Sequence, residues 1–163
     1  KELIRVKTCL MYEADKYFDM KISTIVQNRI PKQILIQWLT QKNLYSRRVN
    51  ESKFMLYKYH PDISGNNKLC GSWGVIRKYL RGNLVFKPKY TSYMYYDQFL
   101  EPWKNFIPVE SDFSDLKEKY IWAEKNQEDA LRIAWRGFSM AHNYLLNIKD
   151  YFIETAIDKI TTF

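Results

Sequence analysis

Short apolar segments with strand character alternate with helical segments along the chain, and this alternation constrains the fold more than any other feature. Residues 54–59, 84–86 and 106–109 read as strands, because they are apolar and rich in aromatic and β-branched residues. Strands that alternate with helices favour a parallel sheet covered by helices. We therefore expect one α/β domain over residues 1–163, with a Rossmann-like parallel sheet and flanking helices. The predicted helices cover residues 34–44, 72–81, 92–100, 114–123, 126–141 and 150–160.

The predicted helices carry recognisable end signals. Gly82 stands where the helix of residues 72–81 should stop. Ser114 and Asn126 can each cap the helix that follows, because their side chains can accept hydrogen bonds from backbone N–H groups. The helix after Asn126 has an apolar stripe formed by Ala130, Ile133, Ala134, Phe138 and Ala141.

The charge of the chain is unevenly distributed. The formal net charge is +8 at pH 7. Residues 1–100 contain 18 Lys and Arg against 7 Asp and Glu, a net of +11, whereas residues 101–163 contain 8 against 11, a net of −3. Such a field favours a phosphate-bearing small molecule or a nucleic acid as partner, although a basic soluble surface explains it equally well. The aromatic content of 17% argues against disorder.

Patterns for catalysis or metal binding are scarce. His60 and His142 are the only histidines, and no Asp-x-Asp, His-Glu-x-x-His or Cys-x-x-Cys motif occurs, so we expect no metal. Ser72 has no evident base, which removes support for a nucleophilic serine. Asp19 and Asp62 are isolated carboxylates, for which we predict surface or turn positions.

Cysteine content and hydropathy leave the compartment open. Cys9 and Cys70 allow one disulfide at most, and the sequence does not decide whether they pair. No apolar run approaches the roughly 20 residues needed to span a membrane. The chain begins with Lys1 rather than Met, so we expect a fragment or a processed product.

A strand, a polar loop and a helix over residues 54–81 form the most informative local pattern. The segment Gly71-Ser72-Trp73-Gly74 places small residues at the helix start, where backbone N–H groups and the helix dipole favour a phosphate. Arg77 follows about a turn and a half into the helix and can fork onto a pyrophosphate. The pattern is neither Gly-x-Gly-x-x-Gly nor a P-loop. An ordinary strand–helix turn with a surface arginine explains it at least as well.

The run from Asn83 onward carries a more specific signal. Residues 83–109, NLVFKPKYTSYMYYDQFLEPWKNFIPV, resemble glycosyltransferase family 90, which includes the protein O-glucosyltransferases and the fungal capsule-associated proteins. The resemblance implies the C-terminal domain of a two-domain, GT-B glycosyltransferase. The shared motifs are Leu-x-Pro-Trp at residues 100–103 and Ile-Pro-Val at 107–109, followed by Asp112-Phe113-Ser114-Asp115-Leu116, Trp122-Ala123 and the run Asn126, Ala130, Ile133, Ala134.

The same resemblance implies which residues bind the donor. In the family, a segment that ends in Arg before the strand at residue 84 holds the nucleotide diphosphate, and Arg77 matches that Arg. Arg5, followed by Phe18-Asp19, resembles a second Arg that contacts the phosphates. The family's catalytic base lies in its N-terminal half, so we expect no catalytic residue in this chain. The expected donor-binding residues are Arg5, Ser72, Trp73, Gly74, Val75, Ile76 and Arg77.

The implied activity is inverting, metal-independent transfer from a UDP-sugar, of the UDP-glucose or UDP-xylose class, to a protein Ser hydroxyl or a glycan. The resemblance also implies the N-terminal half of the enzyme as a partner, a chain that is inactive alone, and the endoplasmic reticulum lumen, or the cytoplasm for a bacterial or viral protein. We expect no cofactor besides the donor substrate, no nucleic acid and no transmembrane segment. Two alternatives remain: a degenerate or non-catalytic nucleotide-binding module, and a basic nucleic-acid-binding domain.

Overall fold

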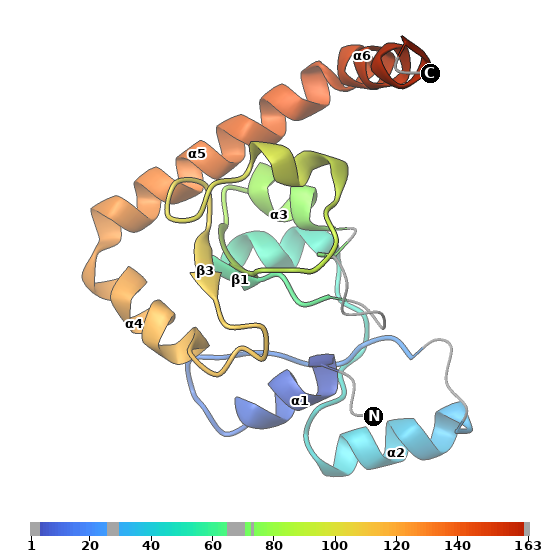
Figure 1. Ribbon diagram of the computed structural model, residues 1–163. Helices are drawn as coiled ribbons and strands as arrows, with labels where there is room; N and C mark the ends of the chain where they lie inside the picture. Colours follow the sequence, from blue (N-terminus) through green and yellow to red (C-terminus); the bar gives the residue numbers. More distant parts are fainter. Residues whose placement is uncertain (1–3, 26–29, 65–70, 73, 162–163) are drawn as a thin grey trace.

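A three-stranded parallel sheet lies at the centre of the fold in the computed structural model, which describes residues 4–25, 30–64, 71, 72 and 74–161 (Figure 1). Its strands are β1 (Tyr59–Pro61), β2 (Leu84–Pro88) and β3 (Ile107–Val109), in the order β1-β2-β3. The register pairs Tyr59 with Leu84 and Phe86 with Ile107. The predicted α/β class is therefore confirmed.

Helices surround the sheet in the described part of the chain. The long α5 crosses beside it and leads into α6 (Figure 1). No helix of the described residues is both long and apolar enough to cross a membrane. The helices are α1 (Ile4–Met11), α2 (Lys32–Gln41), α3 (Val75–Leu80), α4 (Leu116–Lys125), α5 (Gln127–Leu146) and α6 (Ile148–Thr161), with the 3-10 helices η1 (Glu51–Leu56) and η2 (Tyr95–Phe99).

β2 is buried on both faces, which explains why its sequence is apolar except at Lys87. Leu84 and Phe86 join a core cluster with α1, α4 and the first half of α5. Val85 points to the opposite face and joins a second cluster with α3, η2 and the second half of α5. Side chains alternate along a strand, so one short strand supports both clusters.

At Gly137, α5 packs closely against α3 and the segment that precedes β3. A Cβ atom at this position would lie 2.7 Å from the backbone oxygen of Asn105 and 2.7 Å from the ring of Tyr79. Glycine therefore allows α5 to approach both groups. The predicted stripe is confirmed for Ala130, Ile133, Ala134 and Ala141, which are all buried.

Two predicted elements differ from the structure. Residues 54–59 were expected to form a strand, but η1 covers Glu51–Leu56 and the strand begins only at Tyr59. Asn50 accepts the backbone N–H of Ser52 at 3.0 Å and so favours a helical turn. Leu84, the partner of Tyr59, follows the turn at Gly82, so residues 54–58 have no strand to pair with. The helix predicted over 92–100 is reduced to the short 3-10 helix η2.

The helix-end predictions have mixed outcomes. Gly82 follows α3 with a φ of 76°, which confirms the predicted stop. Ser114 does not cap α4, because the helix begins at Leu116 and Asp115 occupies the N-cap position. Asp115 instead accepts the backbone N–H of Glu110 at 2.8 Å. Asn126 is the N-cap residue of α5, but its side chain bonds to Trp122 rather than to the new helix.

A small third cluster joins α1 and α2. Cys9 packs there with Leu39 and Leu44, and all three are buried. Burial raises the pKa of the Cys9 thiol to about 11. Cys9 is a free cysteine, while Cys70 lies outside the described residues.

Candidate functional site

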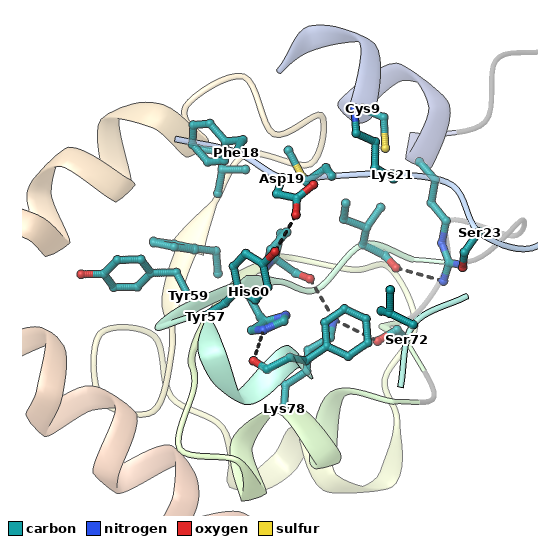
Figure 2. A pocket seen from close by; sticks show the side chains of 18 of the residues that line it. Cys9, Phe18, Asp19, Lys21, Ser23, Tyr57, Tyr59, His60, Ser72 and Lys78 are labelled. Carbon is teal, nitrogen blue, oxygen red and sulfur yellow. Dashed lines mark hydrogen bonds between the residues drawn. The ribbon is translucent and has the colours of Figure 1, made fainter. Parts of the chain in front are cut away.

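A cavity of about 630 Å³ lies beside β1, the edge strand of the sheet. Residues 17–23 form one wall, and η1, β1 and the start of α3 form the other (Figure 2). A cavity of this volume is in the range of small-molecule sites. Ligands of open α/β sheets bind at the carboxyl ends of strands, and β1 ends here at Pro61.

The lining of the cavity is strongly basic. Among its described residues Asp19 is the single carboxylate, and it accepts a hydrogen bond from the Tyr57 hydroxyl at 2.5 Å. The cations outnumber it five to one. Lys58 and Lys78 are paired with Glu124 and Asp62 behind the lining, and the remaining positive charge favours an anion in the cavity. The five cations are Arg5, Lys21, Lys53, Lys58 and Lys78.

Aromatic side chains form much of the remaining wall. Tyr59 packs edge-on against Tyr120, with ring centroids 5.7 Å apart. His60 is largely buried, and this burial lowers the pKa of its imidazole. Its Nε2 lies 3.0 Å from the backbone oxygen of Phe54. Aromatic rings beside cations can hold a flat ring and a charged group together.

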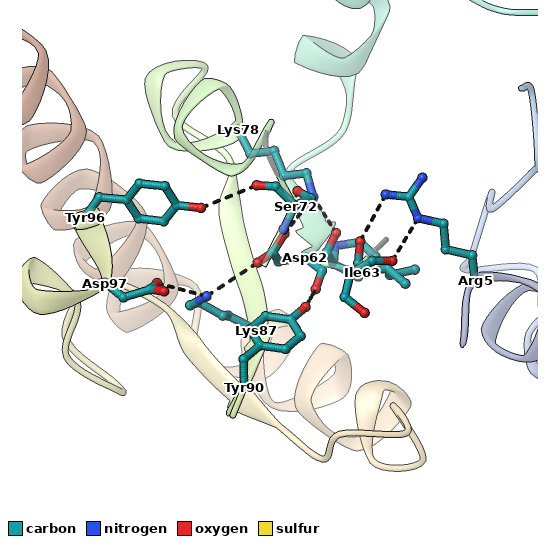
Figure 3. Close-up of polar contacts among 11 residues, drawn as sticks. Arg5, Asp62, Ile63, Ser72, Lys78, Lys87, Tyr90, Tyr96 and Asp97 are labelled. Atoms are coloured by element: carbon teal, nitrogen blue, oxygen red, sulfur yellow. Dashed lines mark hydrogen bonds and ion pairs between the residues drawn. The ribbon is translucent and has the colours of Figure 1, made fainter. Parts of the chain in front are cut away.

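A buried ion-pair network lies under the cavity (Figure 3). Asp62 is fully buried, with Lys78 and Lys87 each 3.5 Å from its carboxylate oxygens. Lys87 also lies 3.1 Å from Asp97. The prediction of a surface or turn role for Asp62 is therefore wrong: its backbone N–H extends the sheet by donating to Phe86 at 2.7 Å, which turns its side chain into the protein.

Asp62 also holds the turn that precedes α3. Its Oδ1 accepts the backbone N–H of Ser72 at 3.0 Å and the Ser72 hydroxyl at 2.6 Å. Gly71 passes so close that a Cβ atom there would lie 2.6 Å from Asp62 Oδ2. Both donors of Ser72 are thus engaged by the protein itself.

The structure brings together some of the predicted donor-binding residues. Arg5, Ser72 and Gly74 line the cavity, with Arg5 donating from Nε to the backbone oxygen of Ser64 at 3.0 Å. Val75 is buried in the core cluster behind α3, and Ile76 packs against that cluster. Trp73 lies outside the described residues.

Arg77 is not among the described residues that line the cavity, although its guanidinium lies close to Gly74, which does line it. Its side chain is 61% exposed and lies 3.3 Å from Glu51, which also pairs with Arg81 at 2.6 Å. Successive helical residues are about 100° apart, so the next residue, Lys78, faces the cavity instead.

Lys78 and Asp62 are the residues that sequence reasoning missed. A signal for Asp62 was available in Lys87, which interrupts the otherwise apolar strand Leu84–Pro88. A lysine in a strand buried on both faces needs a buried anion. No comparable signal identifies Lys78, because its inward direction depends on how α3 packs.

The described residues contain no group of three or more His, Cys, Asp or Glu arranged to hold a metal ion. The basic cavity lies directly above the ion-pair network of Asp62, Lys78 and Lys87. This combination is typical of a pocket for an anionic small molecule.

Residues 13–155 match the family model described as glycosyl transferase family 90. This match covers most of the chain and includes the parallel sheet, α5 and the cavity wall except for Arg5 and Cys9. The chain belongs to glycosyl transferase family 90.

Individual relatives match over shorter stretches. Protein O-glucosyltransferase 3 of Homo sapiens is 35% identical over 92 residues, which are 56% of this chain and 18% of that protein. Protein O-glucosyltransferase 2 of Danio rerio is 31% identical over 100 residues, 61% of this chain and 19% of that protein. The uncharacterized protein 027R of Frog virus 3 is 35% identical over 52 residues, 32% of this chain and 5% of that protein. The chain spans less than a fifth of the length of either glucosyltransferase.

Proposed function

We propose that this chain forms the donor-binding part of a glycosyltransferase, and that its ligand is a UDP-sugar of the UDP-glucose or UDP-xylose class. The acceptor is a protein Ser hydroxyl or a glycan. Family membership and the similarity to protein O-glucosyltransferases support this activity. The proposed architecture is GT-B, with this chain as its C-terminal, nucleotide-binding part.

The basic cavity is the single observation that carries the proposal. It has about 630 Å³ of space and five cations against one carboxylate among its described lining residues. A nucleoside diphosphate sugar combines negative charge, a flat base and a polar ring. We expect the cations to contact the diphosphate, the aromatic rings to stack on the base, and the polar groups of residues 57–64 to bond to the sugar.

The proposed chemistry is inverting displacement without a metal ion. The acceptor hydroxyl, deprotonated by a base outside this chain, attacks the anomeric carbon, and the bond to the diphosphate breaks. The leaving UDP takes the electron pair, so nearby cations stabilise the negative charge that develops on it. Arg5 and Arg77 are the cations that the family resemblance proposes for this role.

Titration of the chain with UDP tests the proposal. We expect saturable binding by calorimetry, with affinity that falls as salt is raised because ionic contacts are screened. Arg5→Met should weaken binding, while Lys149→Met, on α6 and away from the cavity, serves as the control. Absence of UDP binding, together with salt-sensitive binding to RNA, would favour the basic nucleic-acid-binding alternative.

Transfer assays separate the enzyme from the non-catalytic module. UDP binding without transfer by the chain agrees with both a donor-binding part and a degenerate copy. Transfer restored by adding the N-terminal half of a protein O-glucosyltransferase would identify the donor-binding part. A location in the endoplasmic reticulum lumen follows from the proposed activity, and fractionation of cells expressing the parent protein tests it.

A further inference from the structure

Two cations reach the same short segment at the end of β1 from opposite sides (Figure 3). From α1, the Arg5 guanidinium donates to the backbone oxygens of Ser64 at 3.0 Å and Ile63 at 3.4 Å. From α3, the Lys78 ammonium donates to the backbone oxygen of Pro61 at 2.8 Å. Both side chains line the cavity.

Lys78 retains capacity for a further partner. Apart from the bond to Pro61, its contacts are long: 3.4 Å to the Ser72 hydroxyl and 3.5 Å to Asp62. An ammonium has three N–H donors, and hydrogen bonds weaken beyond about 3.2 Å. The side chain is 18% exposed and opens onto the cavity, so one N–H can turn to a ligand.

The electrostatics at Lys78 favour an added anion. Burial lowers the pKa of Lys78, the carboxylate of Asp62 raises it, and the positive charges of Arg5 and Lys87 lower it further. Two cations that repel each other at a cavity wall are stabilised when an anion in the cavity binds near both of them. Arg77 lacks this environment, because it is paired with Glu51 at the surface.

We propose that Lys78 contacts the diphosphate of the donor together with Arg5, and that Asp62 is the positioning residue that holds Lys78 in place. This inference rests on the proposed function, since it assigns residues within the same site. It differs from the family resemblance, which pairs Arg5 with Arg77 rather than with Lys78.

The neighbouring residues Arg77 and Lys78 provide a matched pair of variants. We expect Lys78→Met to weaken UDP binding about 10- to 100-fold, the effect of losing one charge-assisted hydrogen bond in a partly buried site. Arg77→Met should change UDP affinity less than about fivefold, since exposed ion pairs contribute little. Lys78→Arg, which keeps the charge, should restore most of the affinity.

Uridine, measured by NMR titration, separates contact from structural damage. It lacks phosphates, so Lys78→Met should leave its affinity unchanged while weakening UDP. A distorted pocket would weaken both ligands. Equal loss for UDP and uridine would therefore overturn the inference, and so would an Arg77→Met effect larger than that of Lys78→Met.

A second variant covers the case in which Lys78→Met does not fold. Asp62→Asn/Lys78→Met removes both charges of the pair. The Asn side chain can still accept the hydrogen bonds from Ser72, and Lys87 keeps Asp97 as its ion-pair partner. This double variant should fold and show the same loss of UDP affinity; UDP affinity equal to that of the wild type would overturn the inference. If the wild-type chain binds neither UDP nor pyrophosphate, both the inference and the proposed function fail. If the wild-type chain binds UDP and substitution of Lys78 does not change the affinity, only the inference fails.

Discussion

The Asp62 carboxylate accepts both the backbone N–H and the hydroxyl of Ser72, at 3.0 and 2.6 Å, across ten residues of sequence. This pairing fixes the turn before α3 to the end of β1. The Asp62 carboxylate can be fully buried because Lys78 and Lys87 flank it. The wall of the cavity therefore depends on a group that never reaches its surface.

Asp62→Ala should lower the free energy of unfolding by about 3–5 kcal/mol, because it removes the carboxylate shared by the buried Lys87 and the partly buried Lys78. Ser72→Ala removes only one hydroxyl bond and should cost about 1 kcal/mol. Urea denaturation measures both values. Asp19→Ala is the control, since Asp19 is exposed and should matter little to stability. Equal effects at positions 19 and 62 would contradict the assigned network.

Gly137→Ala should destabilise the protein although alanine is the better helix former. The added methyl group would lie 2.7 Å from the Asn105 oxygen and from the Tyr79 ring, and overpacking of this kind costs about 1–3 kcal/mol. Thermal unfolding measures the change. Arg136→Ala, at the exposed neighbouring position of α5, should stay within about 0.5 kcal/mol. A stabilised Gly137→Ala variant would show that α5 does not approach so closely.

Leu56→Ala should leave stability within about 0.5 kcal/mol, because Leu56 is 83% exposed at the end of η1. Phe86→Ala in the central strand should cost about 3–5 kcal/mol, since Phe86 is 1% exposed. Both variants are compared by urea denaturation. A large loss at Leu56 would instead support the strand that its sequence suggested.

His60 should make stability fall in mild acid. Burial lowers the folded-state pKa of His60 below the ordinary 6.5, so the unfolded chain binds more protons between the folded-state pKa and 6.5. The free energy of unfolding therefore decreases as pH falls through this interval. His60→Gln removes the effect, and the difference between the two proteins should be constant above about pH 7.5, where the unfolded imidazole is also neutral. Parallel pH profiles down to pH 5 would contradict the assignment.

The parts of the fold that depend on local pattern were predictable from sequence. The apolar strand around Val85, the stop at Gly82 and the buried stripe of α5 were all confirmed. Each is encoded by neighbouring residues, through burial on both faces of a strand, a left-handed turn or helical spacing.

The strand predicted over residues 54–59 failed because strand formation requires a partner. Met55 and Leu56 are apolar enough for a strand, but β2 is too short to reach them, and both side chains are exposed. The prediction of a surface or turn position for Asp62 failed for a related reason. Its sequence surroundings are those of a turn, and its burial depends on Lys87 from β2 and Lys78 from α3. The cavity itself combines residues from α1, η1, β1 and α3, which no local pattern brings together.

α5 contributes residues to the core clusters on both faces of the sheet. When the packing on one face opens, part of the same continuous helix stays packed in the cluster on the other face. We expect the amides from Ala130 to Tyr144 and those of β2 to show one common free energy of opening in hydrogen exchange, as for a single global opening rather than separate local ones. The two layers of the fold are thus joined into one cooperative unit by a single helix.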